Sequence, residues 1–468
     1  MNEKEFKEIC LDKGFWRHNL KDTLIPYTSI NKERLINNLY IKIKSREYYP
    51  SPPQNYLISN KGNQVLRVIP VFKLEDLCVY FYCTRKLEKY IAKNRVEGTY
   101  GGWSLNGETK IEEEVDLSSY DKEFISVQEF EGDYYTFIQS GEYEISTNFN
   151  PQAWAANWGD FTNKIYKYSV DDYVNSYVAE LDIANFYDSV RLDHLEYIIR
   201  SNIESKDNEV VYLLFHFLKY WNRHNNFYVH QNAGLPQDLF GECSRILANF
   251  YLQSYDKKMK ELCDKLGAKY FRYADDQVVF AKSTEVIKNI IARSSSYLMR
   301  IGLNLNQKKV HVRKKSEFNN YFAFEILMQL GGSNNVVSSK NIDKAIEFYL
   351  KNKQDLRSGG RTLVRAILSS LKKADGKMKK IDDLIKFILT KDFLVSHPPD
   401  FKDYKKIYSN IDTKQKKYFL ALLKDITKEC LHTDFLFHHK RFLASQAISY
   451  KFIQKHINRV NNIYNLKI

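Results

Sequence analysis

The sequence contains little cysteine and no long apolar run. Six cysteines are spread over 468 residues without the paired spacing of a metal site, and at this density a disulfide framework is implausible. No apolar stretch approaches the roughly 18 residues that a membrane span requires. The start of the chain, Met1–Cys10, is charged and typical of a helix rather than of a signal peptide. We therefore expect a cytoplasmic protein with no membrane partner.

Aromatic residues and positive charge are abundant. With 34 tyrosines and 29 phenylalanines the chain can bury a large core, so disorder is not the expected class. Its length predicts about two to four domains or subdomains. The net charge of +14 is concentrated at one end: from Lys340 to Ile468, 28 lysines and arginines stand against 13 aspartates and glutamates. Such a region is either a solvated surface or a surface that grips a phosphate backbone.

Two adjacent carboxylates, Asp275 and Asp276, stand between two strand-like segments. Lys269–Arg272 precedes them and Val278–Phe280 follows, so the pattern predicts a hairpin that carries acidic side chains at its turn. An isolated Asp-Asp pair is most often a solvated turn. The interpretation as a metal site therefore depends on what else the chain supplies.

A third carboxylate, Asp182, lies at the end of an alternating, strand-like segment that begins at Tyr177. Together with the hairpin and two further segments it forms an ordered set of motifs. In chain order these are Asp182, then Gly234–Gln237 with the helical pattern from Ser244 to Tyr255, then Tyr273–Asp276, then Leu303–Lys309. The set resembles the palm motifs of reverse transcriptases over about residues 176–312, and four motifs in family order are far more specific than any one of them.

The resemblance implies an α+β, right-hand polymerase with fingers, a palm built on an antiparallel sheet, and an α-helical thumb. It also implies an RNA-directed DNA polymerase that joins dNTPs, with an RNA template and a DNA product. Two divalent ions would activate the primer hydroxyl and stabilise the leaving pyrophosphate. Mg²⁺ prefers hard oxygen ligands, and Mn²⁺ can substitute for it. The metal-binding residues that the resemblance implies are Asp182, Ile183, Asp275 and Asp276. Without cations, mutual repulsion should raise the pKa of at least one of the carboxylates.

The choice of nucleotide depends on the position five residues after Asp182, which is Tyr187. In the resemblance, an aromatic ring here closes against the sugar and rejects a ribose 2′-hydroxyl, which favours dNTPs; the alternative is that Phe186 and Tyr187 are both core aromatics. Gln237 resembles the glutamine that braces the incoming nucleotide. The following residue departs from the family pattern, because Asp238 stands where glycine is common. A carboxylate near the template would repel phosphate, so we expect a loop that is reshaped or that engages a cation or an unusual template.

Three basic residues complete the candidate site. Lys309 matches the lysine that donates a proton to pyrophosphate, although it could also be one more solvated lysine. Arg67 and Lys73 resemble basic groups that the fingers present to the triphosphate. The catalytic residues that we expect are thus Asp182, Asp275, Asp276 and Lys309, and the nucleotide-binding residues are Tyr187, Gln237, Arg67 and Lys73.

We expect four regions along the chain. They are an N-terminal helical extension over 1–60, fingers over 61–175, a palm over 176–335, and a basic α-helical thumb or C-terminal domain over 336–468, with an acidic, aromatic-rich insertion in the fingers at about 100–165. Residues 111–146 hold 11 acidic residues against the single Lys122. An acidic patch should avoid nucleic acid and could face a basic surface of a second copy, so a homo-oligomer is a hypothesis.

Among reverse transcriptases, a standalone chain with divergent fingers and a basic helical C-terminus looks most like the bacterial abortive-infection and defence-associated enzymes. That resemblance implies antiphage defence with a noncoding RNA, and polymerisation that is template-relaxed or protein-primed in some members. A retron or group II intron enzyme is an alternative. A third possibility is an RNA-binding scaffold that retains a palm fold without activity; the three acidic residues argue against it.

Overall fold

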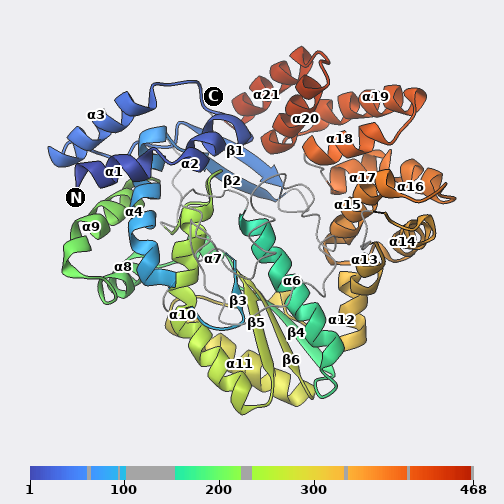
Figure 1. Ribbon diagram of the computed structural model, residues 1–468, viewed down its shortest axis with the longest axis horizontal. Coiled ribbons are helices and arrows are strands. Elements are labelled where there is room, and N and C mark those ends of the chain that lie inside the picture. The colour runs from blue at the N-terminus through green and yellow to red at the C-terminus, as the bar shows by residue number, and fades with distance from the viewer. Residues whose placement is uncertain are drawn as a thin grey trace. The chain divides into compact units, whose positions relative to one another are not determined.

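The computed structural model describes residues 1–60, 65–92, 95–101, 153–222, 234–330, 336–397 and 401–464 (Figure 1). These residues separate into two compact units. The first consists of the described parts of 1–54, 70–101 and 153–315, and the second of those of 55–69 and 316–464. Most of the insertion expected at about 100–165, including residues 111–146, lies outside the described residues. Residues 55–69 belong with the C-terminal unit, a grouping that the sequence did not suggest.

A five-stranded sheet forms the centre of the first unit, in the order β3-β5-β6-β4-β7. The strands are β3 (Thr99–Tyr100), β4 (Tyr177–Asp182), β5 (Lys269–Tyr273), β6 (Asp276–Ala281) and β7 (His311–Lys314). Only β3 and β5 pair in parallel; β5–β6, β6–β4 and β4–β7 are antiparallel. The predicted strand from Tyr177 and the predicted hairpin are therefore confirmed.

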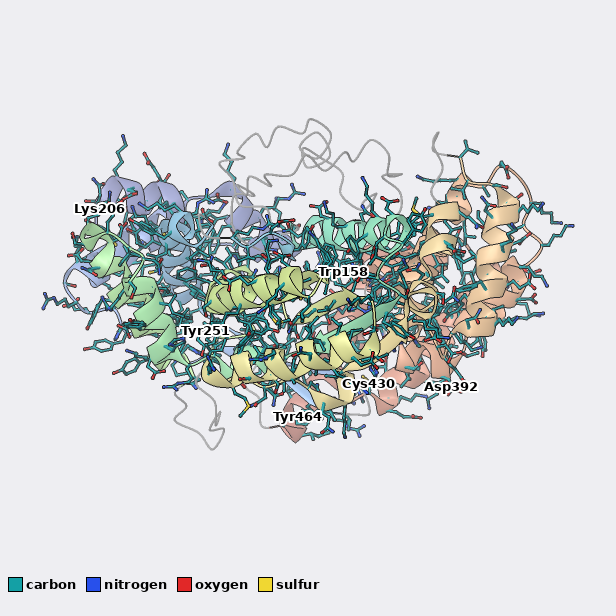
Figure 2. All side chains as sticks on the ribbon, turned by 90° about the horizontal axis from the view of Figure 1, so that it is seen from below. Trp158, Lys206, Tyr251, Asp392, Cys430 and Tyr464 are labelled. Atoms are coloured by element: carbon teal, nitrogen blue, oxygen red, sulfur yellow. The ribbon has the colours of Figure 1, made fainter. Side chains whose placement is uncertain are left out.

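Helices cover both faces of this sheet, as Figure 1 shows. On one face lie α10 (Glu242–Lys265) and α11 (Thr284–Arg300), and on the other lies α6 (Ala153–Asp171). Side chains alternate between the faces of a strand. Tyr270 of β5 accordingly bonds to α10, whereas the ring of Phe271 packs on Tyr168 of α6. Figure 2 labels Trp158 on α6 and Tyr251 on α10.

Most of the remaining α-helices of the first unit pack around α4 (Leu74–Ala92), which itself packs on α10. The remaining α-helices are α1 (Glu3–Cys10), α2 (Lys13–Arg17), α3 (Lys32–Lys44), α7 (Phe186–Ser189), α8 (Leu192–Arg200) and α9 (Asn208–Tyr220). The side chains of Asn2, Asp12 and Asn31 cap the first three helices by accepting backbone N–H groups. The helical character predicted for the start of the chain is confirmed.

The described part of the second unit is helical apart from a two-stranded sheet of β1 (Asn55–Asn60) and β2 (Leu66–Val71). The last two residues of β2 belong to the first unit. The α-helices of the second unit are α12 (Lys315–Phe322), α13 (Phe324–Leu330), α14 (Ser339–Asn352), α15 (Arg361–Ser370), α16 (Ile381–Ile388), α17 (Lys391–Ser396), α18 (Phe401–Ser409), α19 (Thr413–Glu429), α20 (Thr433–Ser445) and α21 (Lys451–Ile463). The first residue of α12 belongs to the first unit. β1 packs on α20, where the Ile58 amide donates a hydrogen bond to Thr433 Oγ1 at 2.7 Å. The predicted series of C-terminal helices is confirmed.

No described helix is both long enough and apolar enough to cross a membrane.

Candidate active site

Asp182 and Asp276 are direct partners across the β4–β6 pair. Ala179, Leu181 and Ile183 join the core beneath α10 and α11, so Asp182, between Leu181 and Ile183, points to the opposite face of the sheet. Direct partners on one face of an antiparallel pair have Cβ atoms about 4.5–5.5 Å apart. The sheet register thus brings together two carboxylates that are far apart in the sequence.

Asp275 occupies the turn of the β5–β6 hairpin. Because Tyr273 pairs with Asp276, the turn consists of Ala274 and Asp275 alone. Burial, with smaller contributions from the charges of Asp276 and Asp182, raises the pKa of Asp275 to about 6. The predicted rise in the pKa of one carboxylate is confirmed, although burial contributes more to it than repulsion does.

Lys309 reaches the same carboxylate group. Its Nζ donates a hydrogen bond to Asp182 Oδ1 at 2.9 Å. The side chain of Asp182 is 8 % exposed, whereas that of Lys309 is 60 % exposed. Partial burial lowers the pKa of Lys309, but the hydrogen bond and negative charge of Asp182 outweigh this and raise it. The lysine is therefore charged and placed against the acidic group, rather than simply solvated.

The backbone explains how Lys309 reaches this position. Residues after the end of β4 pair with the loop that leads into β7: the Asn306 amide donates to Asp182 O, and the Ala184 amide donates to Asn304 O, both at 2.8 Å. These two hydrogen bonds flank Ile183, which pairs with Leu305 in an antiparallel bridge. The backbone N–H and C=O of Ile183 itself take no part in this bridge. Successive carbonyls along a strand point to opposite edges. The carbonyl of Ile183 therefore points to the β6 edge, where the hairpin turn lies.

Tyr187 lies in α7, directly after β4, and its hydroxyl is close to the acidic site. Burial raises the pKa of Tyr187 to about 12; Arg245 opposes this effect, and the charge of Asp275 adds to it. The neighbouring Phe186 is 3 % exposed and belongs to the core. The two adjacent aromatics therefore have different surroundings, and only Tyr187 senses the charge of Asp275.

The loop before α10 packs tightly against Tyr187. A Cβ on Gly234 would lie 2.1 Å from Tyr187 O, so only glycine fits here. The next amide, that of Leu235, donates to the same carbonyl at 2.9 Å. Ser244 of α10 fixes the other side of this loop by donating to Pro236 O at 2.5 Å. Gln237 follows and is partly exposed.

The carboxylate of Asp238 is bound by the backbone of the turn that precedes α10. Its Oδ1 accepts the Gly241 amide at 2.9 Å, and Gly241 adopts a φ of 64° that favours glycine. Burial raises the pKa of Asp238 to about 6, while the backbone hydrogen bonds from this turn lower it. At the position where the sequence departs from the family pattern, the carboxylate is thus engaged by the backbone, and the expected change in the loop stays a prediction.

Arg67 and Lys73 fall in different compact units. Arg67 is an exposed residue of β2 in the second unit, and Lys73 is an exposed residue just before α4 in the first. Their assignment to the nucleotide therefore stays a prediction.

Arg245 was not recognised from the sequence. It forms an ion pair with Glu242 at 2.5 Å and lies beside Tyr187, and the charge of Glu242 keeps its pKa above the usual value despite burial. Its signal in the sequence is a charged residue within the apolar pattern of α10.

Comparison with known proteins agrees with this site. Residues 148–326 match the family described as "Reverse transcriptase (RNA-dependent DNA polymerase)". This range contains β4, α10 and the β5–β6 hairpin. Among solved structures, one titled "Structure of apo telomerase from Candida Tropicalis" aligns with 93 % of this chain and 74 % of that chain, at 12 % identity and a TM-score of 0.33. Similarity at that level supports no further conclusion. No curated protein matches the sequence.

Residues 148–326 thus carry a reverse transcriptase domain on an α+β, right-hand polymerase fold. The protein is an RNA-directed DNA polymerase, a nucleotidyltransferase that copies an RNA template into a DNA product.

Enzymes of this class use divalent metal ions. Among the residues that the structure describes, no three acidic, histidine or cysteine side chains already form a metal-holding group. The donor chemistry nevertheless fits a hard cation, because carboxylate oxygens converge where burial and repulsion disfavour their charge. Lys309 supplies a counter-charge on Asp182 in this arrangement.

Proposed function

We propose that Asp182, Asp275 and Asp276 hold two Mg²⁺ ions, with Mn²⁺ able to replace them, at the site where dNTPs are joined. The observation that carries this proposal is the pairing of Asp182 with Asp276 beside the turn of Asp275. When bound, the ions activate the primer hydroxyl and neutralise charge on the pyrophosphate. The carbonyl of Ile183, directed to the same edge of β4, is the remaining protein ligand in the proposal.

The surrounding side chains have separate tasks in this proposal. Lys309, kept protonated by the acidic group, donates a proton to the leaving pyrophosphate. The ring of Tyr187 excludes a ribose 2′-hydroxyl and so selects dNTPs. Gln237 braces the incoming nucleotide from a loop that Gly234 and Ser244 hold against the palm. Lys73 is the proposed triphosphate contact on the first unit. Arg67 lies in the second unit, so its contact with the triphosphate is a separate proposal.

The basic helices after residue 336 act as the thumb in this proposal and grip the primer–template backbone. One face of α19 supports this role. Successive helical residues turn by about 100°, so the exposed Lys414, Lys417, Lys424 and Lys428 share one stripe along the helix, and the exposed Tyr418 lies at its edge. A lysine stripe with an adjacent aromatic ring suits a phosphate backbone with stackable bases.

We place the enzyme in antiphage defence, acting with a noncoding RNA. The support is the resemblance to defence-associated enzymes, together with the altered loop at Asp238 and the basic helical unit. A retron or group II intron enzyme is the alternative. Sequencing the nucleic acid that co-purifies with the protein, before and after adding Mg²⁺ and dNTPs, separates these possibilities. DNA covalently attached to protein would indicate protein priming, and products unrelated to a co-purified RNA would indicate relaxed template use.

The central test is Asp275→Asn, which keeps the shape of the side chain but removes its charge. We expect DNA synthesis on a primed RNA template and protection against phage to be lost together. Asp264→Asn, on an exposed side chain near the end of α10, is the matched control. Retention of DNA synthesis in Asp275→Asn would overturn the metal-site assignment. Loss of synthesis with phage protection retained would instead support an RNA-binding scaffold.

A homo-oligomer and a cytoplasmic location remain part of the proposal. The acidic segment that suggested self-association lies outside the described residues. A sedimentation mass equal to that of the monomer at micromolar concentration would remove the oligomer from it.

A further inference from the structure

Arg272 is one of the largest fully buried side chains of the protein. It lies on β5, two residues before the turn of the catalytic hairpin, and both it and Asp256 of α10 are 0 % exposed. Its Nε donates to Asp256 Oδ1 at 2.8 Å and its Nη2 to Asp256 Oδ2 at 2.6 Å. This two-pronged geometry is the strongest form of an arginine–carboxylate pair.

Such a pair is not explained by stability alone. Removing two charges from water is costly, and apolar replacements of buried ion pairs are often as stable as the pair itself. Asp256 gains one more hydrogen bond, from Tyr270 Oη at 2.9 Å, so the carboxylate is well satisfied. The third guanidinium nitrogen, Nη1, is not needed to neutralise Asp256, and its hydrogen bonds indicate a further role for the pair.

That donor, Nη1, holds the turn. It donates to Ala274 O at 2.7 Å and to Asn249 Oδ1 at 2.8 Å. Ala274 has a φ of 51°, a left-handed conformation that a side chain with a Cβ disfavours and glycine does not. Its carbonyl belongs to the peptide group that leads directly into Asp275. The orientation of this peptide therefore sets the direction in which Asp275 leaves the turn.

The guanidinium is itself held from two positions on α10. Asp256 fixes two of its nitrogens and Asn249 the third, and the Asn249 amide also donates to Gly101 O, just after β3. A group that is fixed on several sides can impose a backbone conformation on its neighbour. The catalytic turn is thus tied to the helix that packs beneath the sheet.

We propose that Arg272, braced by Asp256 and Asn249, is a positioning residue that holds the left-handed turn at Ala274 and thereby aims Asp275. The inference rests on the proposed function in one respect, namely that Asp275 is a metal ligand. Arg272 does not touch substrate in this proposal; it acts through the backbone of the turn.

The experiment combines Arg272→Lys with Ala274→Gly. The lysine keeps a positive charge beside Asp256 but cannot make the forked contact and reach Ala274 O at once. We expect Arg272→Lys to lower kcat about 10- to 100-fold, with little change in the KM for dNTP, and to weaken Mn²⁺ binding measured by electron paramagnetic resonance. Because glycine adopts a positive φ freely, adding Ala274→Gly should restore most of both losses.

The deciding comparison is how much Ala274→Gly raises kcat and Mn²⁺ affinity in the Arg272→Lys protein and in the natural chain. A gain several-fold larger in Arg272→Lys than in the natural chain supports positioning through the turn. Equal effects in the two backgrounds, or natural kcat and Mn²⁺ affinity in Arg272→Lys, would overturn it. Should Arg272→Lys fail to fold, the apolar pair Arg272→Met with Asp256→Leu, checked by thermal unfolding, carries the same comparison.

The proposal can also be separated from the assignment of Asp275. If Asp275→Asn retains full Mn²⁺ binding and activity, the proposed function of Asp275 fails, whatever Ala274→Gly does. If Asp275→Asn is inactive while Ala274→Gly brings no selective recovery, only the role of Arg272 fails.

Discussion

Lys309 Nζ lies 2.9 Å from Asp182 Oδ1, so the loop before β7 places a positively charged lysine at the end of β4. In the proposed function, the lysine would compete with a divalent ion for the carboxylate of Asp182 and would also donate the proton to pyrophosphate. We therefore expect Lys309 to have opposite effects on metal binding and on turnover.

We predict that Lys309→Met binds Mn²⁺ several-fold more tightly and turns over about 10²–10⁴-fold more slowly than the natural chain. Removal of the positive charge relieves the competition for Asp182, and removal of the proton donor slows pyrophosphate departure. Electron paramagnetic resonance titration and single-turnover kinetics measure the two effects. Lys308→Met, at the exposed neighbouring residue, is the matched control. Weaker metal binding in Lys309→Met would contradict the competition.

Tyr187 should determine which sugar the enzyme accepts. Tyr187→Val removes the ring and is expected to raise incorporation of ribonucleotides relative to deoxyribonucleotides about 10- to 100-fold, whereas Tyr187→Phe, which keeps the ring, retains the discrimination. Phe186→Leu is the control: Phe186 is buried, so this change lowers thermal stability without altering sugar choice. Primer extension with each nucleotide class measures the ratio. Unchanged discrimination in Tyr187→Val would leave Tyr187 with a packing role only.

Asp275 should make stability depend on pH when no metal is bound. Its pKa is raised from 3.8 to about 6 in the folded protein, so the folded state binds the proton more tightly than the unfolded state. The contribution of this group to the free energy of unfolding is therefore most favourable below pH 3.8. It falls as the pH rises towards about 6 and stays low above that value. Asp275→Asn should remove this slope.

Thermal unfolding in a chelating buffer, from pH 4.5 to 7.5, measures the difference between the two proteins. We expect Asp275→Asn to be the more stable protein at neutral pH and to lose this advantage towards acid pH. If stability changed with pH in the same way in both proteins, the pKa of Asp275 would not be raised in the folded state.

The Gly234 loop should not tolerate even one added methyl group. Gly234→Ala places a Cβ against Tyr187 O and is expected to cost about 1–3 kcal/mol of stability, together with most of the activity, because the loop and Tyr187 are displaced together. Gly376→Ala is the matched control, since its Cβ would meet only Ser339 Oγ at 3.5 Å. Thermal unfolding and primer extension measure both proteins. A fully active Gly234→Ala enzyme would contradict the proposed coupling.

The lysine stripe of α19 should account for part of the salt dependence of nucleic-acid binding. Lys414→Glu combined with Lys417→Glu is expected to weaken binding of a primed template and to reduce the slope of log K against log salt by about 0.7–0.9 for each lost phosphate contact. Lys4→Glu, at an exposed residue of α1, is the control. An unchanged slope would remove this face of α19 from the proposed grip.

The acidic site could be predicted from the sequence because its parts leave local signals. Asp182 ends an alternating strand, Asp275 lies in the hairpin turn, and Asp276 begins the next strand. Each signal comes from a short stretch of chain, and the order of the motifs supplies the rest. The pairing of Asp182 with Asp276 then follows from the sheet register, which a sequence pattern indicates only indirectly.

The supporting residues could not be predicted in this way. Arg272 and Asp256 lie in elements that carry other charged residues, so the sequence does not mark them as a buried pair. Their partnership exists only because α10 packs on β5. The function of Asp238 depends on the left-handed turn at Gly241. The grouping of residues 55–69 with the C-terminal helices likewise arises from tertiary packing, since β1 contacts α20.

The pairing of β4 with β6 also sets a condition on biosynthesis. In the chain the two strands are separated by α7 to α10 and by β5, so the ribosome must synthesise this whole stretch before Asp182 can meet its partner. A nascent chain that stops short of β6 holds the first acidic residue but no assembled centre. We therefore expect a fragment that ends before β6 to synthesise no DNA, because it lacks the carboxylate that pairs with Asp182.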